Sequence, residues 1–255
     1  MPRLTPTGLR SRTGRSDRLG FGVPAYAHPL LAPSEWAELA RPGTPLHWVA
    51  LNVSRGPGTR PDPLYTEAVG RLREAAVPVI GVLDSRHGDR PFAQLVSDAH
   101  HYLEWYGVDG FYLERAPTER EGVSDCRRVT TTLRALLGAD GDGDGGDGHI
   151  VLGHGSHPYP GYAEVADQLV TFCGPWTDYR WSEAPQWTAG YPPERFCHLV
   201  HGVPAPHLDN AMRIARWQGA ATVFFTDRSD HAAWEGLPGY WGEVSRLVRR
   251  RPSDD

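Results

Sequence analysis

The sequence predicts an α/β protein that folds as a single-domain (β/α)₈ barrel of the TIM type. Three observations lead to this fold class. The chain contains short, continuous apolar runs of the kind that buried parallel strands require. These runs alternate with amphipathic stretches of helical spacing, and eight of them fall within about 205 of the 255 residues. Eight strands that alternate with helices fit a closed barrel better than an open sheet.

The predicted elements follow one another in a regular order. Apolar, β-rich runs predict strands at residues 22–26, 47–53, 78–83, 110–114, 149–153, 168–173, 195–201 and 221–226. Amphipathic stretches between them predict helices at residues 33–39, 63–76, 92–106, 123–137, 159–166 and 208–218. Between the sixth and seventh strands, residues 174–194 are rich in Pro and Trp and predict a loop in place of a helix.

The barrel is expected to span residues 21–247. Residues 1–20 form a basic segment that we expect to be a disordered tail, as we do for residues 248–255, and the Gly- and Asp-rich residues 138–148 predict a flexible loop. No apolar segment typical of a signal peptide follows the basic start. The sequence therefore predicts a cytoplasmic protein, or a secreted one if the true start of the chain lies elsewhere.

Composition argues against several partners. The formal net charge is −5, which is unlike the basic surface that binds nucleic acid or anionic membranes. No run approaches the ~18 apolar residues that a membrane span needs. Cys126, Cys173 and Cys197 have no paired spacing, so neither a disulfide framework nor a zinc site is indicated. Asp140 begins a calcium-loop-like pattern, but Val151 stands where the bidentate Glu is required, and we expect no metal or other cofactor.

The candidate site lies at the carboxyl ends of the strands, because the loops there carry the chemistry of this fold. These positions hold polar, aromatic and acidic side chains, a combination typical of a carbohydrate cleft. The candidates for substrate binding are Tyr26, His28, Asn52, Arg86, His154, Trp176 and His201. The aromatic residues of the 174–194 loop stack on sugar rings in one interpretation and pack over the barrel mouth in the other.

Glu114 is the main catalytic candidate. It ends a buried strand, and desolvation there raises the pKa of a carboxyl group as a general acid requires. The alternative role is a structural ion pair with Arg86 or Arg115. Asp84 and Asp227 are candidates for a second catalytic carboxylate, although each is also close in sequence to an arginine.

A tight turn is predicted after the second strand. Arg55-Gly-Pro-Gly58 follows that strand as a phosphate-binding loop would. However, no Gly-Lys-Ser/Thr follows it, and Pro57 lacks the backbone donor that such a loop uses.

Several segments resemble the spherulation-specific family 4 (spherulin-4) and occur in the family's order over residues 21–247. They are Val23-Pro-Ala-Tyr26, Asn52-Val-Ser-Arg-Gly-Pro-Gly58, Val79-Ile-Gly-Val82, Trp105-Tyr-Gly-Val-Asp-Gly-Phe-Tyr-Leu-Glu114, Phe225-Thr-Asp227 and Leu237-Pro-Gly-Tyr-Trp241. The family is similar to (β/α)₈ glycoside hydrolases, and some members cleave galactosamine-containing exopolysaccharide. The resemblance therefore implies the same barrel and an amino-sugar oligo- or polysaccharide as the partner.

The chain departs from the family pattern at its acidic positions. An adjacent Asp-Glu pair is expected after the fourth strand, where this chain has Glu114-Arg115. A further carboxylate is expected at the end of the sixth strand, where this chain has Cys173, and the Asn-Pro-Gly expected after the fifth strand is replaced by residues 153–155. Glycoside hydrolysis normally needs two carboxylates that flank the scissile bond.

Three functions follow from these departures. The first is a barrel that binds carbohydrate but has lost its catalytic carboxylates, a pseudoenzyme. The second is an active glycoside hydrolase that uses Glu114 with Asp84 or Asp227. The third is a small-molecule or scaffold function unrelated to carbohydrate, since fold alone does not fix function.

Overall fold

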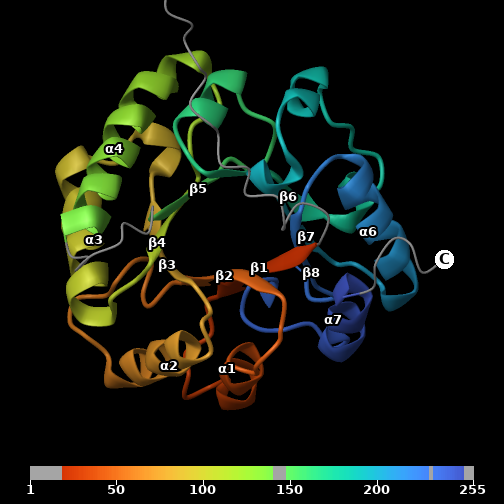
Figure 1. Cartoon of the computed structure of the whole chain (residues 1–255), viewed down its shortest axis with the longest axis horizontal. Coiled ribbons are helices and arrows are strands. Elements are labelled where there is room, and N and C mark those ends of the chain that lie inside the picture. Colours follow the sequence, from red (N-terminus) through yellow and green to blue (C-terminus); the bar gives the residue numbers. More distant parts are fainter. Residues whose placement is uncertain (1–18, 140–147, 230–231, 250–255) are drawn as a thin grey trace, which may run out of the picture.

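The chain folds into a closed barrel of eight parallel strands in the computed structural model, which describes residues 19–139, 148–229 and 232–249 (Figure 1). The strands lie in chain order, and the eighth pairs with the first. They are β1 (Gly20–Ala25), β2 (Leu46–Leu51), β3 (Val79–Asp84), β4 (Gly110–Glu114), β5 (His149–Gly153), β6 (Gln168–Pro175), β7 (Phe196–His201) and β8 (Thr222–Phe225). The predicted (β/α)₈ fold is confirmed.

The helices form an outer ring around the barrel (Figure 1). They are α1 (Pro33–Leu39), α2 (Pro63–Glu74), α3 (Phe92–Tyr106), α4 (Val123–Ala139), α5 (Trp176–Tyr179), α6 (Leu208–Trp217) and α7 (Trp241–Arg249). The ring is thinnest after β5, where the connection holds a 3₁₀ helix at Pro160–Glu164, and after β6, where α5 has four residues. The predicted loop at 174–194 therefore includes the end of β6, α5 and two 3₁₀ turns.

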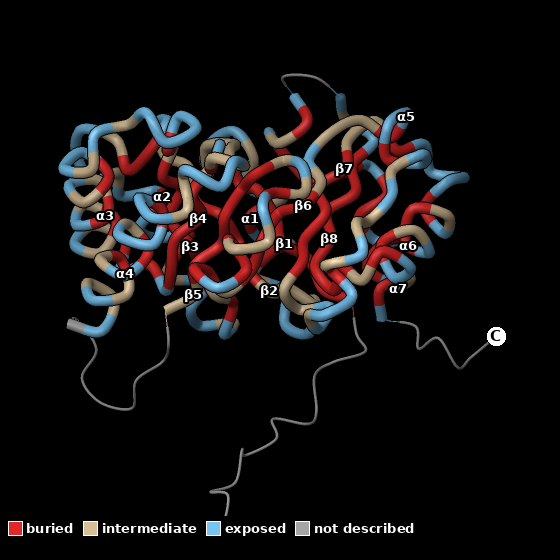
Figure 2. The backbone as a smooth tube through the Cα atoms, turned by 90° about the horizontal axis from the view of Figure 1, so that it is seen from above, coloured by how far each residue is buried: buried red, intermediate tan, exposed pale blue. Residues whose placement is uncertain are grey.

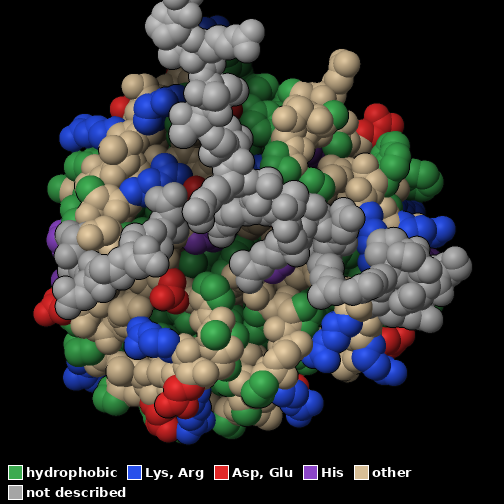
Figure 3. Space-filling model, viewed as in Figure 1, with side chains coloured by type: hydrophobic (Ala, Val, Ile, Leu, Met, Phe, Trp, Pro, Cys, Tyr) green, Lys and Arg blue, Asp and Glu red, His purple; other side chains and the backbone are tan. Residues whose placement is uncertain are grey.

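Burial follows these two layers. The strands are buried along most of their length, whereas the helices and loops expose one side (Figure 2). On the face seen in Figure 3, hydrophobic side chains lie in the central hollow, and arginine and acidic side chains lie toward the rim. No helix in the described part of the chain is long and apolar enough to cross a lipid bilayer.

A polar network crosses the barrel interior. The Trp48 indole N–H donates to Gln168 Oε1 at 2.8 Å, and Gln168 Nε2 donates to Thr222 Oγ1 at 2.8 Å. The Trp48 ring also stacks on Tyr112, with 6.0 Å between ring centroids. Gly22 makes room for this ring, because a Cβ at that position would lie 2.3 Å from Trp48 Cζ2. The buried polar groups thus tie β2, β6 and β8 together inside the barrel.

The barrel is slightly longer than its predicted span of 21–247. β1 already begins at Gly20, and α7 continues to Arg249. Residues 138 and 139, predicted as the start of the flexible loop, instead end α4. The rest of that loop up to residue 147, and the predicted tails at 1–18 and 250–255, lie outside the described residues.

Candidate functional site

A hydrogen bond between Tyr26 and Glu114 joins two strand ends at the mouth of the barrel. Tyr26 directly follows β1, Glu114 is the last residue of β4, and the phenol donates to Glu114 Oε1 at 2.9 Å. The two residues lie 88 positions apart in the sequence. Closure of the barrel brings them together at the end where this fold places its chemistry.

The surroundings of Glu114 favour its protonated form. Burial raises the pKa of this carboxyl, and the nearby negative charge of Asp84 adds to the effect. The hydrogen bond from Tyr26 and the positive charge of Arg115 oppose the rise without cancelling it. Burial, with the Glu114 charge, also raises the pKa of Tyr26 well above its ordinary value, so the phenol remains a donor. Glu114 therefore has the environment of a general acid.

Asp84 lies next to Glu114 but is held by an arginine. The two are register partners on β3 and β4. Arg115 Nε donates to Asp84 Oδ1 at 2.9 Å, and Arg115 Nη2 donates to Oδ2. The backbone N–H of Arg86 also donates to Oδ1, at 3.0 Å. Burial would raise the pKa of Asp84, but these hydrogen bonds and the charges of Arg115 and Arg86 outweigh it and lower the pKa.

The backbone that presents this ion pair has an uncommon conformation. Arg86, His87 and Arg115 have φ values of 50°, 57° and 51°, in the left-handed region that non-glycine residues seldom adopt. The His87 N–H and the Ser85 hydroxyl both donate to the Arg115 carbonyl, each at 2.7 Å. Such strain persists where the surrounding structure enforces it, and it concentrates at functional sites.

Cys173 adds a thiol to the same mouth. It lies near the carboxyl end of β6, where the charge of Glu114 acts on the thiol. Desolvation of the thiol and that charge raise its pKa to about 12, although part of the residue is exposed. Cys173 therefore stays neutral and supplies no charge to replace a carboxylate.

The other acidic candidate, Asp227, faces a different loop. It is exposed after β8, and its Oδ1 accepts the N–H of Gly239 at 3.1 Å. Within the described part of the chain, no hydrogen bond or ion pair links Asp227 to Glu114 or Asp84. The mouth thus joins Tyr26, Asp84 and Glu114, whereas Asp227 fixes the segment that leads into α7.

Three of the predicted binding residues pack against other aromatic rings, and two of them are buried. His154 is buried with its ring edge-on to Tyr162, and burial lowers its pKa to about 4. Trp176 is buried and stacks on His207 with 5.5 Å between ring centroids. His201 meets Trp234 edge to face at 5.9 Å.

The aromatic residues of the 174–194 loop divide between packing and exposure. Tyr179 is fully buried, and Trp187 packs against Tyr191 and Phe196. Trp181 is 76% exposed, with the Arg180 guanidinium 5.2 Å from its ring centroid. Packing over the barrel therefore accounts for most of these rings.

A pocket with a volume of about 710 Å³ lies beside the mouth and was not predicted from the sequence. His28 and the residues after Asn52 contribute to it, and the predicted tight turn forms one wall. Asn52 Oδ1 accepts the Gly56 N–H at 3.0 Å, and His28 Nε2 lies 3.1 Å from Asp62 Oδ2. The cluster of arginine, glycine and proline at residues 55–60 was the available signal.

A second pocket, of about 490 Å³, lies between α3 and α4. In the described residues no group of three or more His, Cys, Asp and Glu side chains is arranged to hold a metal ion.

Comparison with known proteins gives consistent results. The sequence model of spherulation-specific family 4 matches residues 21–248. Spherulin-4 of Physarum polycephalum is 25% identical over 159 residues, which are 62% of this chain but only 45% of that protein. The crystal structure of Aspergillus clavatus Sph3 in complex with GalNAc superposes with a TM-score of 0.77 at 22% identity, over 91% of this chain and 98% of that one. The Bacillus cereus spore cortex-lytic enzyme SleL gives 0.56 at 12% identity, over 91% and 74%. At these identities the structural matches establish the fold.

Proposed function

Because the chain belongs to the spherulation-specific family 4, we propose that it binds amino-sugar oligo- or polysaccharide at the mouth of its barrel and hydrolyses it weakly or not at all. The bound GalNAc of Aspergillus clavatus Sph3 supports the ligand class. The polar groups of Tyr26, Asp84 and Glu114 supply hydrogen-bonding partners for sugar hydroxyl and amide groups.

The proposed loss of hydrolysis rests on one observation: Arg115 donates hydrogen bonds to both carboxylate oxygens of Asp84. Hydrolysis needs a proton donor and a second carboxylate that attacks the sugar or activates water. Glu114 suits the first role. Asp84 is the nearest candidate for the second, but a bidentate guanidinium lowers its basicity and occupies a lone pair on each oxygen.

The positions that depart from the family pattern supply no substitute. The guanidinium of Arg115 stays protonated and carries donors only, so it neither accepts a proton nor attacks a sugar. Its positive charge also opposes a developing oxocarbenium ion. The neutral thiol of Cys173 lacks the charge of a carboxylate.

Turnover on galactosamine-rich polymers, measured as released reducing ends, tests this proposal. The proteins compared are the wild type, Glu114→Gln and the double variant Arg115→Glu/Cys173→Glu. We expect binding but negligible release by the wild type and measurable release by the double variant, since acid–base assistance alone is worth ~10²–10⁴-fold in rate. If the wild type hydrolyses the polymer and Glu114→Gln abolishes that hydrolysis, the proposed loss of activity is wrong. Failure of every amino-sugar polymer to bind would favour the non-carbohydrate function.

The second candidate function is an active glycoside hydrolase in which Glu114 is the acid and Asp84 the second carboxylate. The opposite pKa shifts of two register partners favour it, because separated pKa values are how a pair of carboxyl groups divides acid and base roles. This candidate requires that Asp84→Asn and Glu114→Gln each abolish a wild-type activity. Asp227→Asn is the matched control, since the Asp227 side chain accepts a hydrogen bond from the Gly239 N–H and has none with Glu114 or Asp84 in the described residues.

A further inference from the structure

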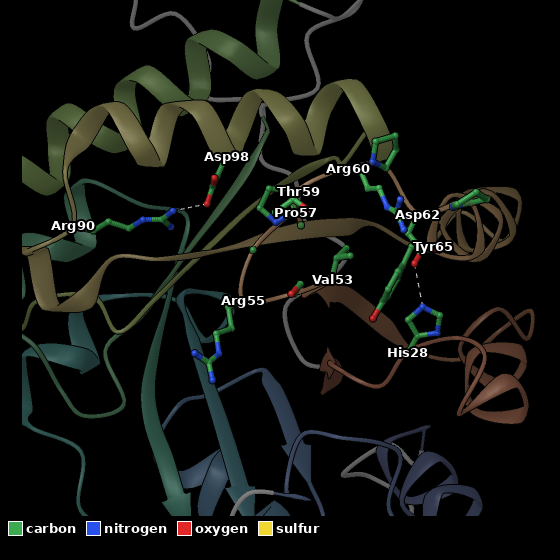
Figure 4. A pocket seen from close by; sticks show the side chains of 15 residues that line it. His28, Val53, Arg55, Pro57, Thr59, Arg60, Asp62, Tyr65, Arg90 and Asp98 are labelled. Carbon is green, nitrogen blue, oxygen red and sulfur yellow. Dashed lines mark hydrogen bonds and ion pairs between the residues drawn. The ribbon is translucent and has the colours of Figure 1, made fainter.

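The pocket beside the mouth is lined by the segments that follow β1, β2 and β3 and by residues of α2 and α3. It takes His28 after β1, the loop after β2 with the start of α2, and Arg90 from the segment that leads into α3 (Figure 4). Its position ties it to the mouth. His28 follows Tyr26 by two residues, and the Arg90 guanidinium donates to the Asp84 carbonyl at 3.4 Å.

The loop after β2 is fixed in a conformation that presents Arg55. Arg55 has a left-handed φ of 53°, and the Val53 and Ser54 N–H groups both donate to the Gly56 carbonyl at 3.0 Å. Asn52 Oδ1 closes the turn by accepting the Gly56 N–H. The Arg55 side chain extends from this loop toward the barrel strands (Figure 4). Non-glycine residues seldom adopt this conformation, which the three hydrogen bonds of the turn hold in place.

The acidic side chains that line the pocket already have partners. Arg90 binds Asp98 at 2.6 Å, with both side chains largely buried. Asp62 lies 3.1 Å from His28 Nε2, and its other oxygen accepts the Leu64 N–H at 2.9 Å to cap α2.

Two positively charged side chains of the pocket lining therefore have no acidic partner among the described residues. Arg55 and Arg60 are exposed and form no ion pair with any residue that the structure describes. Guanidinium groups present a planar fork of donors that matches carboxylate, sulfate and phosphate groups.

We propose that this pocket is a subsite for an acidic sugar: it binds the anionic substituent of a unit adjacent to the sugar held at the Glu114 mouth. The inference rests on the proposed carbohydrate function and adds a charge preference to it. A uronic acid carboxylate and a sulfate or phosphate ester share the required chemistry. A sugar with a free amine has the wrong charge for the two arginines, so deacetylated galactosamine units are disfavoured at this position.

Calorimetric titration with matched trisaccharides tests the proposal. A galactose and a galacturonic acid trisaccharide differ only at C6, a 6-sulfated galactose trisaccharide separates ester from carboxylate, and inorganic phosphate probes the bare anion. A GalNAc trisaccharide reports on the mouth. We expect at least one of the two anionic trisaccharides to bind roughly tenfold more tightly than the neutral galactose trisaccharide, as charge-assisted hydrogen bonds predict.

Variants locate the effect. Arg55→Gln/Arg60→Gln is expected to remove the anionic preference while leaving GalNAc binding intact. Arg127→Gln/Arg216→Gln removes two exposed arginines on α4 and α6, which lie outside the pocket, and is expected to keep the preference. The single substitutions Arg55→Gln and Arg60→Gln are each expected to lose part of it.

The possible failures are distinguishable. Equal binding of anionic and neutral trisaccharides, or a preference that survives Arg55→Gln/Arg60→Gln, would overturn the subsite. Phosphate binding to these arginines without any trisaccharide preference would mean an adventitious ion only and would also overturn it. Absence of GalNAc binding, with an arginine-dependent preference retained, would overturn the proposed amino-sugar function and support the subsite.

Discussion

Glu114 and Asp84 end neighbouring strands, yet their surroundings move their pKa values in opposite directions. Burial dominates at Glu114, whereas the hydrogen bonds of Asp84 to Arg115 and Arg86 outweigh its burial. The sequence could place Glu114 in a site because it ends an apolar strand. It could not pair Tyr26 with Glu114 or Asp84 with Arg115, because these contacts depend on barrel closure and strand register.

Glu114→Gln is predicted to stabilise the protein at neutral pH. The pKa of folded Glu114 lies above its ordinary value of 4.5, so its favourable contribution is present below that value and is lost as the pH rises through the folded pKa. At pH 7 the amide avoids a partly buried charge and still accepts the Tyr26 hydroxyl. Urea denaturation at pH 7 should therefore show a higher free energy of unfolding for Glu114→Gln than for the wild type.

The gain should shrink as the pH approaches 4, where Glu114 is protonated in the folded and unfolded protein alike. Glu104→Gln, on the exposed face of α3, serves as the control and should change little at either pH. A Glu114→Gln protein that is less stable than the wild type at pH 7 would show that the ionised carboxylate is favourable where it stands.

At the scale of elements, long and regular hydrophobic patterns predicted strands and helices correctly, whereas shorter patterns did not. The predicted strands at 110–114 and 149–153 and the helix at 92–106 coincide with β4, β5 and α3. α7 was not predicted, although its buried residues Trp241, Val244 and Val248 have helical spacing. The helix predicted at 159–166 is a 3₁₀ helix of five residues, Pro160–Glu164.

Asp62 is predicted to stabilise α2, which forms one wall of the pocket beside the mouth. Its side chain accepts the Leu64 N–H and thereby satisfies a donor that the first helical turn leaves free. Asp62→Ala should lower the free energy of unfolding by about 1 kcal/mol, measured by urea denaturation. Asp62→Asn keeps an N-cap of similar strength and should lose much less. Equal losses in the two variants would instead assign the effect to the His28 pair.

At the scale of the whole molecule, barrel closure determines both the core and the site. Parallel pairing runs from β1 through β8 and back to β1, so the strand ends converge on one opening. The alternation of apolar runs and helices in the sequence contains enough information for this topology. The pocket beside the mouth could not be predicted from this alternation, because its wall depends on how the loop after β2 folds back against α2 and α3.

Gly22→Ala is predicted to disturb the barrel interior. The added Cβ would lie 2.3 Å from Trp48 Cζ2, and the Trp48 indole is held by Gln168. Overpacking of this kind costs ~1–3 kcal/mol. Gly70→Ala is the matched control, because that glycine lies within α2 with open space around its Cβ position and alanine favours helix by ~1 kcal/mol. Thermal unfolding should therefore show Tm falling for Gly22→Ala and rising for Gly70→Ala; an unchanged Tm for Gly22→Ala would mean that the interior yields freely.

We propose that the mouth binds an amino-sugar chain and cleaves it weakly or not at all because Arg115 holds Asp84. Mass spectrometry of a GalNAc oligosaccharide incubated with the protein tests both parts at once, since the complex and any shorter fragments are measured in the same sample. We expect a complex with the intact oligosaccharide and little or no accumulation of fragments. Absence of a complex, or fragments that accumulate with the wild type and disappear with Glu114→Gln, would contradict it.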